Sequence, residues 1–213
     1  MKYDVLLFDL DGTLTESGIG ITRSVAYALR KHGIEETDQA KLDRFVGPPL
    51  IDSYIRWYGF TPEQARQGVD DFREYFERQG MFENRVYDGV VPMLEGLKAA
   101  GVRCVVATSK PEQYAVQILE RFGLLPYFDY VAGATMDERR TNKAEVIAYA
   151  MERITPGSRV VMVGDREHDI LGAKAHGLDS VGVLYGYGSR EELETSGATY
   201  IAATAEEILS IIE

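Results

Sequence analysis

The chain has 213 residues, 45% of them apolar, which allows one large domain, or a core with a smaller insert, around a sizeable hydrophobic core. Its 23 lysines and arginines against 34 aspartates and glutamates give a net charge of −11, which argues against general binding to nucleic acids or anionic membranes. A single cysteine, Cys104, excludes an intrachain disulfide. With no apolar run long enough to span a membrane and no signal peptide, we predict a soluble cytoplasmic protein.

The first predicted element is a short apolar strand followed by two acids. Residues 5–8 form a continuous apolar run, which at this length is typical of a buried parallel strand. Asp9 and Asp11 come next, so both carboxylates face one site if the extended geometry persists, and Gly12 allows a tight turn. Mg²⁺ or a shared proton would relieve the repulsion between two such carboxylates. The alternative is that both acids are solvated turn residues.

Residues 16–85 are predicted to form an all-helical unit inserted after this strand. The apolar spacing predicts helices over 20–33, around 42–46, from Pro49 to Tyr58, and from a Thr61 cap to about Phe76. The unit is rich in aromatic side chains, and their spacing favours a helical core over a ligand pocket. These residues are Tyr54, Trp57, Tyr58, Phe60, Phe72, Tyr75, Phe76 and Phe82.

From residue 87 onward, predicted strands and helices alternate. The strands are expected at 102–107, 130–132, 159–163, 180–184 and 198–201. The helices are expected at 90–100, 111–122, 143–153, 167–175, around Leu193, and at 205–212. Strands separated by helices imply an α/β fold with a doubly wound parallel sheet. We therefore predict a core of residues 1–15 and 86–213, with Cys104 as a small core residue.

Polar side chains follow two more of these segments. The strand at 102–107 ends in Thr108 and Ser109 before a helix that Pro111 begins, and a helix N-terminus is suited to phosphate. Simple helix capping by either hydroxyl is the alternative. Lys143 follows Asn142, a predicted N-cap, so its charge opposes the helix dipole and calls for a nearby anion. A solvated lysine on a charged loop is the other interpretation.

A second apolar strand that ends in an acid is predicted at 159–163. Gly164 permits close backbone approach, Asp165 follows it, and Asp169 lies one helical turn further on. Helix capping explains one acid better than it explains the pair. The three histidines are interpreted as non-catalytic, since a hard cation does not call for imidazole: His32, His168 and His176.

The segment Asp9-Leu10-Asp11-Gly12-Thr13-Leu14 resembles motif I of the haloacid dehalogenase superfamily of phosphohydrolases. The later segments are similar to motifs II, III and IV of that family, in the same order and each near a predicted strand end or loop. The resemblance implies a Rossmann-like core and a helical cap at residues 16–85. It also implies Mg²⁺-dependent hydrolysis of a small phosphorylated metabolite through an aspartyl-phosphate.

The resemblance further implies a role for each matching residue. Asp9 would be the nucleophile and Asp11 the general acid/base, and Asp11 disfavours the dehalogenases, which lack it. Thr108, Ser109, Lys143 and Gly12 would bind the phosphoryl group. The implied Mg²⁺ ligands are Asp9, Asp165 and the backbone carbonyl of Asp11. Asp169 would bind the metal through water or hold a neighbouring side chain.

Two further segments suggest a subgroup. Gly186-Tyr187-Gly188-Ser189 resembles phosphoglycolate phosphatases, whereas Ala144 after Lys143 and the turn Gly47-Pro48-Pro49 are closer to members described as 5′-nucleotidases. We hypothesise that Gly47 and Pro48 form a stiff cap loop over the leaving group, and that Arg44 is available to an anionic substrate. A phosphosugar mutase and a receiver-like regulator that is phosphorylated without turnover stay open as alternatives. The protein is expected to be a monomer or a homodimer.

Overall fold

The computed structural model describes residues 1–137 and 140–213. By its internal contacts the chain divides into two compact units, Met1–Thr15 with Val86–Glu213, and Glu16–Arg85. Two short strands lie where the chain passes from one unit to the other, and they pair with each other: β2 (Thr15–Glu16) and β3 (Arg85–Val86). None of the helices in the described part of the chain has the length and apolar character needed to cross a bilayer.

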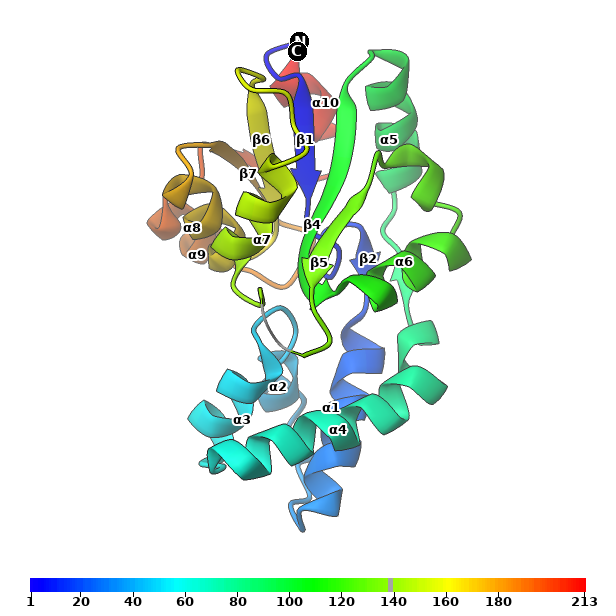
Figure 1. The fold of residues 1–213 in the computed structure, drawn as a ribbon, viewed down its shortest axis with the longest axis vertical. Helices are drawn as coiled ribbons and strands as arrows, with labels where there is room; N and C mark the ends of the chain where they lie inside the picture. Colours follow the sequence, from blue (N-terminus) through cyan, green and yellow to red (C-terminus); the bar gives the residue numbers. More distant parts are fainter. Residues whose placement is uncertain (138–139) are drawn as a thin grey trace. The chain divides into compact units, whose positions relative to one another are not determined.

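The larger unit contains a six-stranded sheet in the described residues, with the order β5-β4-β1-β6-β7-β8 and every neighbouring pair parallel (Figure 1). Its strands are β1 (Val5–Phe8), β4 (Arg103–Pro111), β5 (Val131–Ala134), β6 (Val160–Gly164), β7 (Asp179–Val183) and β8 (Tyr200–Ala202). The chain runs outward from β1 on one side and then on the other. The strand order therefore reverses at β1, and open α/β sheets bind ligands at such a switch point, beyond the carboxyl ends of the strands.

Helices cover both faces of this sheet, as a doubly wound topology requires. In Figure 1, α7 and α8 lie on one face and α5 and α6 on the other. The helices of this unit are α5 (Val90–Ala99), α6 (Glu112–Arg121), η2 (Leu125–Tyr127), α7 (Lys143–Met151), α8 (Glu167–Ala175), α9 (Arg190–Ser196) and α10 (Glu207–Ile212). The expected α/β class with a doubly wound parallel sheet is confirmed.

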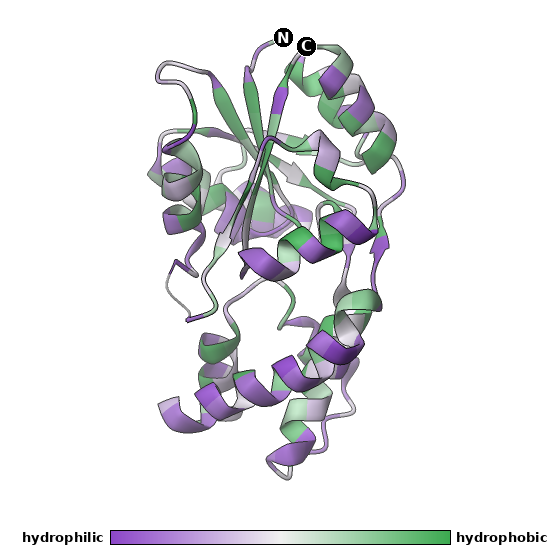
Figure 2. Ribbon diagram, turned by 45° about the vertical axis from the view of Figure 1, so that its right-hand side comes forward, coloured by the Kyte–Doolittle hydropathy of each residue, from purple (hydrophilic) through white to green (hydrophobic). Residues whose placement is uncertain are grey.

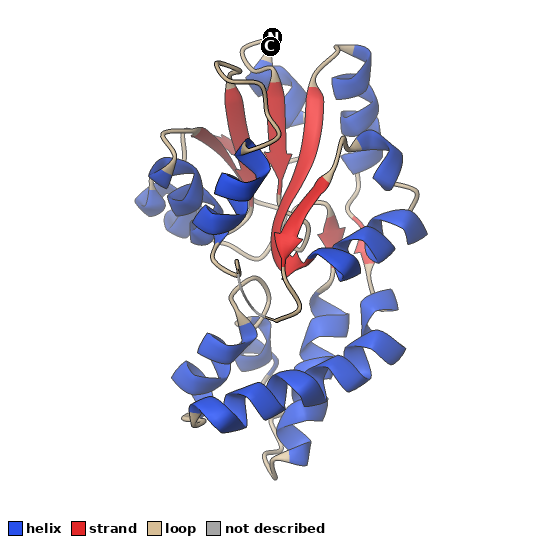
Figure 3. Cartoon of the chain, in the orientation of Figure 1, coloured by secondary structure: helices blue, strands red, loops and turns tan. Residues whose placement is uncertain are grey.

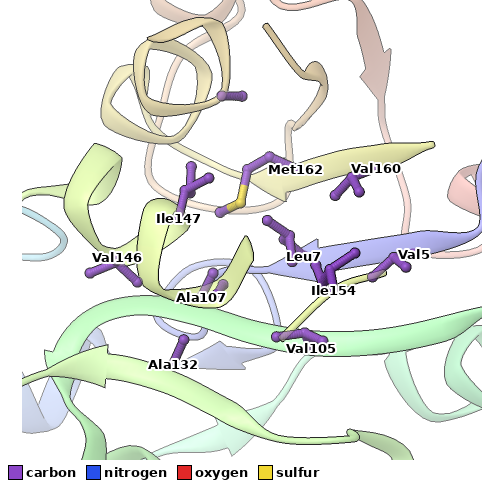
Figure 4. Close-up of a cluster of buried hydrophobic side chains, with 12 residues drawn as sticks. Val5, Leu7, Val105, Ala107, Ala132, Val146, Ile147, Ile154, Val160 and Met162 are labelled. Atoms are coloured by element: carbon purple, nitrogen blue, oxygen red, sulfur yellow. The ribbon is translucent and has the colours of Figure 1, made fainter. Parts of the chain in front are cut away.

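Alternation along the strands decides which residues pack under α7 and α8. Val5 and Leu7 of β1 belong to one buried cluster with residues of β4, β5, β6, α7 and α8 (Figure 4). Leu6 and Phe8 are equally buried but lie outside this cluster, so β1 is apolar on both faces. Asp9 continues the alternation of Val5 and Leu7 and is thereby directed towards the side of the sheet that α7 covers.

The smaller unit is helical, as Figure 3 shows. Its elements are α1 (Gly18–Lys31), α2 (Gln39–Asp43), α3 (Leu50–Tyr58), α4 (Pro62–Arg78) and η1 (Gly80–Phe82). Thr61 caps α4 as expected: its hydroxyl accepts from the Gln64 N–H, and the Gln64 side chain accepts from the Thr61 N–H. In Figure 2, α1 and α4 carry both green and purple residues, which is typical of amphipathic helices.

The aromatic residues of this unit pack largely as predicted. Tyr54, Phe60, Phe72 and Phe76 are buried, and Tyr54 stacks on Phe60 with ring centroids 5.3 Å apart. Phe82 departs from the expectation, because 41% of it is exposed at the end of the unit. The helix boundaries differ from those predicted by one or two residues at most ends, which is usual for fraying termini.

One difference in the sheet bears on the site. The sequence predicted a strand that ends at residue 107 and a helix that Pro111 begins, but β4 continues to Pro111, which is the N-cap residue of α6. The prediction was wrong because it took the proline as the first helical residue. The last residues of this longer strand before Pro111 are Thr108, Ser109 and Lys110. Cys104 is buried near the start of β4, where burial raises the pKa of its thiol to about 12.

Candidate active site

Asp9 leaves the sheet at its centre. The four residues of β1 pair on one side with β4 and on the other with β6, and the Asp9 N–H donates to the carbonyl of Val163 over 2.9 Å. The acid therefore sits beyond the carboxyl end of β1, the strand at which the strand order reverses. Asp9 is only 6% exposed.

A tight turn follows Asp9. The N–H groups of Thr13, Leu14 and Thr15 all donate to the carbonyl of Leu10, over 3.3, 2.9 and 3.0 Å. Gly12 has φ of +86°, and a Cβ atom on it would lie 2.2 Å from Oδ2 of Asp165. Both the backbone conformation and the space thus require glycine at this position. The turn brings the chain after β1 against the acid that follows β6.

Lys143 opens α7 and reaches the same place. The Asn142 side chain caps this helix by accepting from the Ala144 N–H. Nζ of Lys143 lies 2.8 Å from Oδ1 of Asp9 and 2.7 Å from Oδ1 of Asp169, and it donates to the carbonyl of Ala107 over 3.0 Å. Burial by itself lowers the pKa of Lys143. The carboxylates of Asp169 and Asp9 raise this pKa by more than burial lowers it, so the net shift is upward. The ammonium is therefore held in its charged form.

Three buried carboxylates gather around this ammonium. Asp9, Asp165 and Asp169 each offer an oxygen, and these oxygens lie within 4.8 Å of one another. Burial first, and then the charges of Asp169 and Asp9, raise the pKa of Asp165 well above its ordinary value. Burial likewise raises the pKa of Asp9 although Lys143 opposes it. When all three are ionised, three carboxylates and one ammonium leave two negative charges uncompensated, and a hard divalent cation with oxygen ligands fits that set.

The loop after β7 holds Asp165 from another side. The Tyr187 N–H donates to Oδ2 of Asp165 over 2.8 Å, and the Thr13 hydroxyl approaches Oδ1 at 3.5 Å. A Cβ atom on Gly186 would lie 2.3 Å from the carbonyl oxygen of Gly12, and one on Gly188 would lie 1.9 Å from that of Asp165. Glycine is the only residue type that allows the loop to approach Gly12 and Asp165 so closely at these two positions.

The other predicted phosphate ligands lie beside the cluster. Thr108 is buried, follows the carbonyl that Lys143 contacts, and accepts the Lys110 N–H on its Oγ1 over 3.2 Å, so its own hydroxyl hydrogen is available for donation. Ser109 is half-buried next to it. Asp11, whose backbone carbonyl is the predicted metal ligand, does not add its carboxylate to the three acids clustered among the described residues; its Oδ2 pairs with Nζ of Lys110 at 2.8 Å.

Lys110 is the functional candidate that reasoning from the sequence missed. Its signal was present, because it lies two residues after Thr108 near the carboxyl end of a strand adjacent to β1. None of the three histidines joins the acidic cluster found among the described residues. His32 and His176 instead contact Asp71 and the Ala144 carbonyl, and burial lowers the pKa of His168.

The predicted cap residues belong to the smaller unit. Arg44 is the C-cap residue of α2, and Gly47, with φ of +106°, and Pro48 lie in the turn before α3. Their contribution to a substrate site stays a prediction.

Residues 6–183 match the family model described as "Haloacid dehalogenase-like hydrolase". The chain belongs to this family. The four motifs that sequence reasoning singled out all lie within the matched region, and the resemblance stated on those motifs is confirmed. The hydrolase is thus an enzyme of the phosphatase class, as its relatives also indicate.

Three comparisons of the hydrolase cover almost all of it. It is 40% identical over 214 residues to a 5′-nucleotidase of Pseudomonas aeruginosa, spanning 100% of this chain and 97% of the relative. It is also 40% identical to the tyrosine-protein kinase PtkA of Mycobacterium tuberculosis, over 96% of this chain and 70% of the relative. The crystal structure of a "predicted phosphatase" from Clostridium acetobutylicum superposes with a TM-score of 0.96 at 47% identity, covering 100% of this chain and 99% of that one. Relatives named phosphoglycolate phosphatase match at 27–33% identity.

Proposed function

We propose that the hydrolase removes the phosphoryl group from a small phosphorylated metabolite by way of an aspartyl-phosphate on Asp9. The observation that carries the proposal is the meeting of Asp9, Lys143 and Asp165 in one buried cluster at the switch point of the sheet. A nucleophile, a cation and a further acid in this arrangement are the parts that phosphoryl transfer needs.

In the first step a carboxylate oxygen of Asp9 attacks phosphorus and forms a new P–O bond. The bond from phosphorus to the ester oxygen breaks, and that oxygen keeps the electron pair and takes a proton from Asp11. Lys143 and the Thr108 hydroxyl stabilise the charge on the remaining phosphoryl oxygens. The support for these roles is the 2.8 Å contact of Lys143 with Asp9 and the Thr108 hydroxyl, whose oxygen accepts from the Lys110 N–H and whose hydrogen can therefore be donated.

In the second step water attacks the phosphorus of the aspartyl-phosphate. Asp11, now a carboxylate, takes the proton of that water, and the bond between phosphorus and Asp9 breaks. Inorganic phosphate leaves, Asp9 is a carboxylate again and Asp11 is protonated again. The two steps therefore return the chain to its starting state.

Mg²⁺ is the proposed cofactor, because the clustered acids are hard oxygen donors whose charges exceed that of Lys143 by two. Asp9, Asp165 and the backbone carbonyl of Asp11 would hold the ion, and Asp169 would hold Lys143. When bound, the ion supplies positive charge to the phosphoryl oxygens.

The proposed substrates are nucleoside 5′-monophosphates and phosphoglycolate, the classes suggested by the names of the relatives. Gly47 and Pro48 would form a stiff loop over the leaving group, and Arg44 would bind an anionic substituent. Replacing Arg44 with Ala should then raise KM unequally across substrates; equal changes for charged and uncharged leaving groups would remove this part of the proposal.

A screen for phosphate release tests the whole proposal. p-Nitrophenyl phosphate, phosphoglycolate, nucleoside monophosphates and sugar phosphates would be compared with Mg²⁺ and with EDTA. Asp9→Asn should abolish turnover while the fold survives, and Asp129→Asn, a half-exposed acid of the same unit, should leave turnover unchanged. Normal activity of Asp9→Asn would refute the nucleophile.

The same screen separates the alternatives. Phosphorylation of the chain without steady phosphate release would favour a receiver-like regulator. A requirement for a sugar bisphosphate would favour a mutase. Transfer of the phosphoryl group to a tyrosine in place of water would favour a transferase, in line with the relative named as a kinase.

A further inference from the structure

Lys110 and Asp11 form an ion pair that the proposed mechanism does not use. Nζ of Lys110 lies 2.8 Å from Oδ2 of Asp11, and the two side chains are only 7% and 10% exposed. Taking two charges out of water carries a desolvation cost that their attraction often fails to recover. A buried pair of this kind is therefore poor evidence for a purely stabilising role.

The local structure of β4 directs Lys110 to this pair. Thr108 lies opposite Gly133 of β5, whereas Pro111 lies opposite the next residue, Ala134, so Ser109 and Lys110 are extra residues on β4. The Lys110 N–H donates to the Thr108 hydroxyl within this irregularity. Bulges of this kind commonly occur next to active sites, where they redirect a side chain.

Gly133 provides a second, independent sign that the irregularity is accommodated by the fold. A Cβ atom on Gly133 would lie 2.8 Å from the carbonyl oxygen of Lys110 and 2.7 Å from Cα of Glu112. A larger residue in place of Gly133 would displace the irregular segment of β4. The neighbouring strand thus leaves room for the conformation that delivers Lys110.

The two oxygens of Asp11 have different surroundings. Oδ2 is paired with Lys110, whereas Oδ1 is buried without a hydrogen-bond partner among the described residues. A carboxyl group held through Oδ2 has a fixed orientation, and its Oδ1 can carry the proton in the first step and accept one in the second. Efficient general acid–base catalysis depends on such positioning within hydrogen-bond reach of the substrate.

We infer that Lys110 is a positioning residue for Asp11, which it holds in the orientation needed to pass a proton to the leaving oxygen. This inference rests on the proposed function, because it assigns Lys110 to the group proposed there as general acid/base. Lys110 itself does not contact the reacting atoms in this scheme; it acts through the Asp11 carboxylate.

The basicity of the leaving group tests the inference without knowledge of the physiological substrate. A nitrophenolate leaves without needing a proton, whereas a methoxyphenolate needs one. kcat/KM would be measured for p-nitrophenyl, phenyl and p-methoxyphenyl phosphate in the native chain and in Lys110→Met. We expect the slope of log kcat/KM against leaving-group basicity to become steeper in the variant, with about a 100-fold loss for the most basic leaving group and a much smaller loss for p-nitrophenol.

Three controls keep the outcomes distinct. Lys110→Arg restores a cation and should return the slope towards the native value. Lys98→Met removes an exposed lysine of α5 and should change nothing. Lys110→Gln replaces Lys110→Met if the latter does not fold, as judged by circular dichroism.

The inference would be overturned by an equal loss of kcat/KM for all three esters, which is what a merely structural role predicts. A gain for the most basic leaving group would overturn it too, since the ion pair would then withhold Asp11. Absence of phosphate release by the native chain is a separate result that would count against the proposed function.

Discussion

Nζ of Lys143 lies 2.8 Å from Oδ1 of Asp9, and only 4% and 8% of the two side chains are exposed. The same ammonium lies 2.7 Å from Oδ1 of Asp169. The ammonium group of the first residue of α7 thus forms ion pairs with an acid that follows β1 and with an acid on α8. Its removal would leave buried carboxylates without compensation, which is among the most destabilising changes a protein core can undergo.

Lys143→Met should therefore affect both activity and stability. Losing one preorganised stabiliser of the phosphoryl charge lowers kcat by about 100- to 1,000-fold. In metal-free buffer the free energy of unfolding should fall by about 3–5 kcal/mol, because a buried ion pair is broken. Phosphate release and urea denaturation measure the two effects. The control Lys174→Met removes an exposed lysine of α8 and should preserve both; native stability in Lys143→Met would contradict the pairing.

Removal of the metal should expose the role of Asp165. If the acidic cluster binds Mg²⁺, an ion concentration 100 times the dissociation constant raises the free energy of unfolding by about 2.7 kcal/mol. Asp165→Asn should lose this gain, yet in EDTA it should be no less stable than the native chain, because it removes a buried charge that is not directly paired with Lys143. Thermal denaturation with Mg²⁺ and with EDTA measures both. An undiminished Mg²⁺ effect in Asp165→Asn would exclude Asp165 as a ligand.

Local patterns made the ends of β1 and β6 predictable. Short apolar runs followed directly by acids identify buried strands with Asp9 and Asp165 at their carboxyl ends, and a doubly wound sheet brings such ends together. The N-cap of α7 was equally predictable, because Asn142 precedes the helical pattern. In the structure its side chain accepts from the Ala144 N–H. These features depend on a few neighbouring residues.

The contacts of Lys110 and Asp169 could not be predicted in the same way. Lys110 reaches Asp11 only because β4 carries two extra residues relative to β5, and the register between two strands is a long-range property. Asp169 was expected to act indirectly, and its spacing from Asp165 does not reveal that its oxygen lies within 4.8 Å of those of both other acids. That proximity depends on how α8 packs against the sheet.

The glycines of the loop after β7 should be essential to activity. In Gly188→Ala the new Cβ would lie 1.9 Å from the carbonyl oxygen of Asp165, so the loop or the acid must move. A displacement of about 1 Å in a catalytic group costs about 100-fold in rate, and we expect a fall in kcat of that order. Gly101→Ala is the matched control: its φ of +72° makes alanine strained, but nothing lies within 4 Å of the new Cβ. It should cost about 1 kcal/mol of stability and no activity; similar kcat losses in both variants would show that the loop does not position Asp165.

The smaller unit contains a buried acid whose pairing makes its stability sensitive to pH. Asp71 on α4 is 2% exposed and lies 2.5 Å from Nζ of Lys31 and 3.1 Å from Nε2 of His32. Burial raises the pKa of Asp71, but hydrogen bonds from Lys31 and Gln67 lower it more, so the net shift is downward from 3.8. A depressed pKa in the folded state stabilises the fold above the ordinary pKa, and this contribution is lost as the pH falls through the folded value.

Asp71→Asn should therefore lower the free energy of unfolding by about 1–3 kcal/mol at pH 7, since Lys31 and His32 lose a charged partner. The deficit relative to the native chain should shrink as the pH falls below about 4, because the native acid then becomes protonated as well. Urea denaturation followed through Trp57, the single tryptophan and a residue of α3, reports on this unit directly. The neighbouring Asp70→Asn alters an acid whose side chain is 67% exposed and should change stability by less than about 0.5 kcal/mol. If the deficit of Asp71→Asn were the same at pH 7 and at pH 3, the lost interaction would not be electrostatic, and the pairing with Lys31 would not stabilise the unit.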